Sequence, residues 1–226
     1  MMKKEIIPAI IAKDQEELES RIDNVKDNVC TIQLDVMDGI FVKNRSIDFD
    51  FKLPEKAGRC SFEAHLMVTD PYGWIERNID KVDTVLVHIE SCSDPEEIID
   101  TVHKKKKRVG FALNPKTDIQ QVRPYIERLD QVLVMTVEPG FYGSKFVREA
   151  LNKVRELREL APEIDIEVDG GMHPDTIGLA AKAGANLFVS GSFTVDSDDP
   201  AAAIAALKKE VQKEVEDEES QEDKGS

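Results

Sequence analysis

Residues 164–192, IDIEVDGGMHPDTIGLAAKAGANLFVSGS, contain a complete strand–helix–strand unit. Two short aliphatic runs, 164–168 and 186–190, have the length and the composition of buried strands. Between the runs, His173-Pro174 is a helix start signal, and Gly184 is suited to cap the end of that helix. The unit predicts a helix that connects two parallel strands.

The same alternation runs through the rest of the chain. Helix start signals occur at Asp14, at Asp70-Pro71 and at Asp94-Pro95. The weakest unit is the second, in which residues 45–59, RSIDFDFKLPEKAGR, must supply a short helix. Eight strands, most of them followed by a helical pattern, predict a single (β/α)8 TIM barrel over residues 1–215. The other six predicted strands lie at about 5–11, 30–36, 61–67, 83–89, 108–113 and 131–137.

The composition argues against several classes of partner. The 45 acidic and 30 basic residues give a formal charge of −15, which is unsuited to a nucleic-acid or anionic-membrane surface. No stretch approaches the roughly 18 consecutive apolar residues of a membrane span, and MMKKEIIPAI at the start lacks a cleavable apolar segment. We therefore expect a cytoplasmic protein without nucleic-acid or membrane partners. Residues 216–226 have almost no apolar side chains and predict an acidic, disordered tail.

Two aspartates stand at strand ends, where the chemistry of this fold gathers. Asp35 points into the barrel if Leu34 and Val36 point out, and Asp169 directly follows the run 164–168. Their strands lie three steps apart around the predicted ring, so the carboxylates can face each other across a small substrate. One acid can then remove a proton α to a carbonyl while the other delivers a proton from behind, which is an epimerisation. Alternatively, each aspartate caps the loop or helix that follows it.

His65 is predicted to lie on the strand next to Asp35. An imidazole and two carboxylates are a suitable ligand set for a divalent cation, which would polarise a carbonyl and stabilise an enediolate. Gln33 could complete the set through its amide oxygen, although a neutral amide is a poor zinc ligand. The alternative is a histidine that is only hydrogen-bonded in the barrel mouth.

Glycine-rich loops form the second candidate constellation. The segments 139–146, 169–171 and 190–192 allow close backbone approach, and phosphate sites of barrels commonly form from the loops after strands seven and eight. Ordinary tight turns are the alternative. Met37, Met67 and Met135, near three strand ends, either pack the core or form an apolar layer around a reactive intermediate.

Seven segments together resemble the ribulose-phosphate 3-epimerase family over about residues 5–195. They are LDVMDGIFVKN (34–44), EAHLMVTDP (63–71), VHIES (87–91), GFALNP (110–115), VLVMTVEPGFYGSKF (132–146), IEVDGG (166–171) and AGANLFVSGS (183–192). The resemblance implies a ribulose-phosphate-binding TIM barrel that interconverts D-ribulose 5-phosphate and D-xylulose 5-phosphate in the pentose phosphate pathway. It also implies one divalent metal ion per subunit and a homo-oligomer.

By position, the resemblance implies that Asp35 is the proton acceptor, that Asp169 is the proton donor, and that both bind the metal together with His65, which also lies near the substrate. The residues that it implies for phosphate contact are Gly140, Phe141, Tyr142, Gly143, Gly170, Gly171, Gly191 and Ser192, and those for the pocket wall are Ala9, Met37, Met67 and Met135.

Two departures from the family pattern matter most for the function. Gln33 stands where the family usually has a histidine metal ligand, and Ala9 where it has a substrate-contacting serine. Zinc, manganese, iron, cobalt and magnesium are all candidate ions, and Gln33 favours either a harder ion such as manganese or magnesium or a site without a tightly bound metal. Two other functions remain open: a non-catalytic sugar-phosphate-binding protein, and a 3-epimerase of another ketose phosphate such as a hexulose 6-phosphate.

Overall fold

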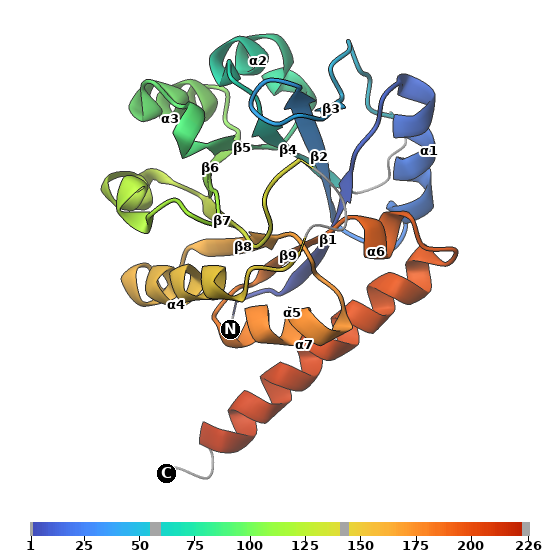
Figure 1. The fold of residues 1–226 in the computed structure, drawn as a ribbon, viewed down its shortest axis with the longest axis vertical. Coiled ribbons are helices and arrows are strands. Elements are labelled where there is room, and N and C mark those ends of the chain that lie inside the picture. The colour runs from blue at the N-terminus through green and yellow to red at the C-terminus, as the bar shows by residue number, and fades with distance from the viewer. Residues whose placement is uncertain (1, 55–59, 141–144, 223–226) are drawn as a thin grey trace.

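The computed structural model describes residues 2–54, 60–140 and 145–222, and it contains a closed ring of eight parallel strands surrounded by helices (Figure 1). The predicted (β/α)8 TIM barrel is confirmed. In ring order, the strands are β1 (Glu5–Ile10), β2 (Thr31–Asp38), β4 (Ser61–Met67), β5 (Thr84–His88), β6 (Arg108–Leu113), β7 (Gln131–Met135), β8 (Asp165–Asp169) and β9 (Leu187–Ser190), and β9 pairs with β1. A two-residue strand, β3 (Arg45–Ser46), adds antiparallel to β2.

The helices begin where their start signals predict. Side chains of Asp14, Asp70 and Asp94 accept hydrogen bonds from the backbone N–H groups of the first turns of α1, α2 and α3. The helices are α1 (Gln15–Val25), α2 (Pro71–Asn78), α3 (Pro95–Lys104), α4 (Leu151–Leu160), α5 (Pro174–Lys182), α6 (Ser192–Val195) and α7 (Pro200–Glu222). Short 3-10 helices span Ile79–Lys81, Ile89–Ser91, Ile119–Gln121, Arg123–Arg128 and Arg148–Ala150.

The connection between β2 and β4 differs from the prediction. Residues 47–54 contain no helix, and residues 55–59 lie outside the described part. Apolar side chains recur there at every second position, at Ile47, Phe49, Phe51 and Leu53, and all four pack on the main core. This period suits an extended segment rather than a helix. Phe51 is fully buried and stacks on Trp74 of α2, with ring centroids 6.4 Å apart, so an irregular segment covers this side of the barrel.

Side chains along β2 alternate between two environments. Leu34 and Val36 belong to the main hydrophobic core, together with Leu18 and Ile22 of α1. Asp35, between them, lines a cavity at the carboxyl end of the barrel. The two-residue period therefore directs polar side chains into the barrel and apolar ones beneath the helices.

Helix α7 packs against α5, and its far end projects away from the barrel (Figure 1). The helix reaches Glu222, so the backbone is helical beyond residue 216, where the sequence predicts a disordered tail. Lysine, glutamate and glutamine are good helix formers, which explains the longer helix. The division of the chain near residue 215 stays a prediction. Within residues 2–54, 60–140 and 145–222, no helix combines the length and the apolar run needed to cross a bilayer.

Candidate active site

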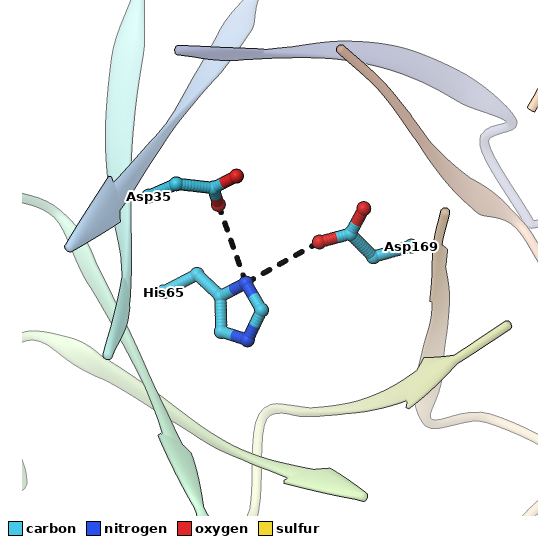
Figure 2. A group of neighbouring side chains, drawn as sticks. All are labelled: Asp35, His65 and Asp169. Atoms are coloured by element: carbon cyan, nitrogen blue, oxygen red, sulfur yellow. Dashed lines mark ion pairs between the residues drawn. The ribbon is translucent and has the colours of Figure 1, made fainter. Parts of the chain in front are cut away.

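Three buried side chains meet at the carboxyl ends of β2, β4 and β8. Nδ1 of His65 lies 3.3 Å from Oδ1 of Asp35 and 3.3 Å from Oδ2 of Asp169 (Figure 2). Asp35 and His65 are register partners in the β2–β4 pair. Asp169 approaches from β8, which is separated from β2 by β1 and β9. The closed ring therefore brings together the two aspartates and the histidine that the sequence singles out.

Gln33 joins the same group through its amide. Its Nε2 donates hydrogen bonds to Oδ1 of Asp35 at 2.8 Å and to Oδ2 of Asp169 at 3.0 Å. The same nitrogen is 3.5 Å from Nδ1 of His65. The amide oxygen, Oε1, is buried and has no hydrogen-bond partner among the described residues. One amide group thus bridges both carboxylates and leaves a buried acceptor unsatisfied.

The residues of this group fit a divalent cation. Ligand atoms of Asp35, His65 and Asp169 all lie within 4.8 Å of one another, and these three form the only such group found in the described part of the chain. Carboxylate oxygens and an imidazole nitrogen suit several divalent metals. A half-turn of the Gln33 amide would place the unpartnered Oε1 where Nε2 now lies. After this rotation, Oε1 would be available as a fourth ligand of the cation.

A second histidine lies behind His65. Nε2 of His65 is 2.9 Å from Nε2 of His88, and Nδ1 of His88 is 3.2 Å from Oε2 of Glu90. Glu90 also accepts hydrogen bonds from the Asn114 N–H and from the Thr117 hydroxyl. The sequence patterns described above do not single out Glu90. Its place in VHIES, two residues after a strand-end histidine, is the signal that could have identified it.

The electrostatic environment shifts the pKa values of the two histidines in opposite directions. Burial acts to lower the pKa of His65, but the carboxylates of Asp169 and Asp35 outweigh it and raise that pKa to about 9. Burial lowers the pKa of His88 to about 4. Burial also raises the pKa of Asp35. Without a metal ion, His65 is therefore the protonated member of the histidine pair at neutral pH.

The cavity at the barrel mouth is lined by both aspartates and by most of the residues that the resemblance implies for substrate contact. Those that line it are Ala9, Met37, Met67, Met135, Gly140, Gly170, Gly171, Gly191 and Ser192. Phe141, Tyr142 and Gly143 lie outside the described residues. Gln33 and His65 are completely buried and do not belong to this lining. Ile11 and Val137 also line the cavity, and each follows a predicted lining residue by two positions, so the strand period could have identified them.

Gly170 shows why glycine is needed in these loops. Its φ is +111°, a conformation that other residues rarely adopt, and a Cβ atom there would lie 2.3 Å from Cγ2 of Val137. The loop after β8 consequently approaches the cavity wall more closely than any side chain would permit.

Residues 5–195 match a family model described as the ribulose-phosphate 3 epimerase family. The chain belongs to the ribulose-phosphate 3-epimerase family. The enzymes of this family are isomerases, and the family binds a divalent metal. The resemblance that the seven sequence segments indicate is confirmed.

Relatives named as epimerases of this family align over nearly their whole length. The ribulose-phosphate 3-epimerase of Schizosaccharomyces pombe is 37% identical over 222 residues, which cover 94% of this chain and 96% of the relative. The cytoplasmic isoform of Oryza sativa subsp. japonica is 38% identical over 214 residues, covering 92% and 94%. The crystal structure of 3-keto-L-gulonate-6-phosphate decarboxylase from Vibrio cholerae has a TM-score of 0.70 at 14% identity, covering 94% and 99%. This last likeness shows the shared fold alone.

Proposed function

We propose that this chain interconverts D-ribulose 5-phosphate and D-xylulose 5-phosphate by proton transfer at C3 between the substrate and the carboxyl groups of Asp35 and Asp169. The observation that carries the proposal is the convergence of two buried carboxylates from across the ring. Each has an oxygen 3.3 Å from the same nitrogen of His65, and both line one cavity. Membership of the epimerase family supports the same reaction.

The two carboxyl groups have complementary roles. In the direction from ribulose 5-phosphate, Asp35 accepts the C3 proton, and Asp169 delivers a proton to the opposite face of the resulting enediolate. Asp35 gains one proton and Asp169 loses one, so the reverse reaction uses the opposite assignment. Burial raises the pKa of Asp35, which makes its carboxylate a stronger base.

The rest of the lining suits the substrate. Met37, Met67 and Met135 form an apolar wall that excludes water from the enediolate. Gly170, Gly171 and Gly191 line the same cavity, and backbone N–H groups of such loops bind phosphate dianions in barrels. The negative charge of the whole chain makes this local capture necessary.

We propose Asp35, His65 and Asp169 as ligands of one divalent metal ion, with Gln33 contributing its amide oxygen after the half-turn described above. When bound, such an ion polarises the substrate carbonyl. An amide oxygen is a harder ligand than an imidazole nitrogen, so residue 33 shifts the preference from zinc toward manganese or magnesium. Iron and cobalt are the other candidates.

The decisive experiment follows C3 proton exchange of D-ribulose 5-phosphate in D2O by NMR. Chelated protein is measured first, and zinc, manganese, iron(II), cobalt and magnesium are then added separately. We expect exchange accompanied by xylulose 5-phosphate with at least one cation. A hexulose 6-phosphate is the second substrate, because Ala9 lines the cavity where the family usually has a serine. Absence of exchange with either sugar under every condition would contradict the proposal and favour the binding-protein alternative.

Two further expectations concern the cellular location and the oligomeric state of the protein. The name of the Oryza sativa relative supports a cytoplasmic location. We also expect self-association from the family resemblance, which light scattering of the purified chain would measure directly.

A further inference from the structure

Two buried histidines, His65 and His88, connect the candidate metal site to Glu90, whose side chain is 23% exposed. The Nε2 atoms of His65 and His88 face each other at 2.9 Å, and Nδ1 of His88 faces Oε2 of Glu90 at 3.2 Å. Both imidazole rings are completely buried. Their centroids are 5.0 Å apart with an interplanar angle of 25°. Each of these two contacts has hydrogen-bond length, so one proton lies between the two atoms of each contact.

Glu90 determines the direction of this chain of hydrogen bonds. Its Oε1 accepts from the Asn114 N–H at 2.9 Å and from the Thr117 hydroxyl. Its other oxygen, Oε2, faces Nδ1 of His88. A carboxylate can only accept hydrogen bonds, so the proton of this contact must belong to Nδ1 of His88.

The consequence passes through His88 to His65. A neutral imidazole with a proton on Nδ1 has a lone pair on Nε2. Nε2 of His88 is therefore an acceptor, and Nε2 of His65 must carry the proton between them. When His65 is neutral, its own lone pair lies on Nδ1, the atom that faces Asp35 and Asp169 (Figure 2).

We infer that Glu90 is a positioning residue that acts through His88 to hold His65 in the tautomer whose Nδ1 can bind a metal ion. This inference deepens the proposed function and rests on the metal site assigned there. Partners of the remaining nitrogen commonly orient histidine ligands in metal sites, and their loss typically weakens metal binding about 10–100-fold.

The variant Glu90→Gln reverses the donor–acceptor direction of the hydrogen bond between residue 90 and His88. Asn114 N–H and the Thr117 hydroxyl favour the amide oxygen at the position of Oε1. The amide NH2 group then faces Nδ1 of His88 and donates to it. The His88 proton moves to Nε2, where it opposes the N–H of metal-bound His65. We expect the variant to bind Zn²⁺ about 10–100-fold more weakly than the wild type.

Long-range ¹H–¹⁵N correlation spectra of the zinc-loaded, full-length chain test the tautomers directly. In the wild type, we expect a proton on Nδ1 of His88 and on Nε2 of His65. In Glu90→Gln, the proton of His88 should lie on Nε2. Titration with Zn²⁺ against a competing chelator gives the affinity, and Glu76→Gln, at an exposed position on α2, is the matched control.

A wild-type His88 with its proton on Nε2 overturns the inference whether or not the variant folds. An unchanged His88 tautomer in Glu90→Gln also overturns it, even if the affinity for Zn²⁺ falls, because Glu90 would then have only a structural role. The spectra do not depend on turnover. Predicted tautomers without C3 exchange would therefore contradict the proposed function and leave this inference standing.

Discussion

Gln33 and Asp169 are joined across the barrel by a hydrogen bond of 3.0 Å, from Nε2 of the amide on β2 to Oδ2 of the carboxylate on β8. The same amide nitrogen donates to Asp35 at 2.8 Å. One neutral side chain therefore holds the two proposed acid–base groups at a common centre. In the structure, this centre is the point where the ligand atoms of the candidate metal site converge.

Replacement of either carboxylate should abolish most of the turnover. We expect Asp35→Asn and Asp169→Asn each to lower kcat by about 10²–10⁴-fold, because an amide cannot take or give the C3 proton. The melting temperature should stay close to that of the wild type. The control is Asp80→Asn, whose side chain is 77% exposed on the outer surface. Unchanged kcat in both variants would show that the acid–base roles are wrongly assigned.

The two variants should also differ from each other. Asp169→Asn keeps the acceptor for ribulose 5-phosphate, so we expect it to retain slow C3 proton exchange of that sugar without forming xylulose 5-phosphate. Asp35→Asn should show the opposite preference for the starting sugar. NMR in D2O from each sugar separately measures both. Equal behaviour of the two variants would contradict a mechanism with one carboxyl group on each face.

Gln33→His should increase the affinity for zinc. An imidazole nitrogen is a better zinc ligand than an amide oxygen, so we expect the dissociation constant of Zn²⁺ to fall by about tenfold or more. Competition with a chelator measures it, and Gln33→Leu, which offers no ligand atom, is the comparison. Equal zinc affinity of all three proteins would mean that residue 33 does not reach the metal.

Because of Glu90, the free energy of unfolding should depend on pH in the acid range. Burial opposes its ionisation, but hydrogen bonds with His88, Thr117 and Asn114 outweigh burial and lower its pKa from an ordinary value of 4.5 to about 2. A lowered pKa in the folded state contributes stability that is complete above the unfolded value and disappears as the pH falls through the folded one. We expect the difference in unfolding free energy between wild type and Glu90→Gln to shrink from pH 4.5 toward pH 2. Urea denaturation of the metal-free proteins measures it, and a difference independent of pH would exclude this origin.

The irregular segment that stands in place of a helix should be important for stability. Phe51 is completely buried against Trp74, so Phe51→Ala should cost about 3–5 kcal/mol of unfolding free energy. Ile40→Ala is the control, because Ile40 is 72% exposed and should change that free energy by no more than about 0.5 kcal/mol. Similar costs for both variants, measured by urea denaturation, would show that residues 47–53 do not cover the core.

The sequence alone was sufficient to predict the barrel and the approach of Asp35 to His65. Strand period, aspartate caps and helix start signals are local properties, because each depends on residues a few positions apart. Asp35 and His65 then follow from the pairing of two consecutive barrel strands. The prediction of a helix after β2 relied only on the repeating strand–helix pattern. The two-residue period of that segment instead indicates an extended chain.

Other features depended on the closed ring and its side chains. The bridge from Gln33 to Asp169, the orphaned amide oxygen and the link from His65 through His88 to Glu90 join atoms of different strands and loops. Local periodicity specifies which face of a strand a residue occupies, and it does not specify rotamers or the partner of each lone pair. These are set by packing and hydrogen-bond satisfaction inside the barrel, which is why the sequence indicated the proposed acid–base pair whereas only the tertiary structure revealed which side chains hold the two carboxyl groups in place.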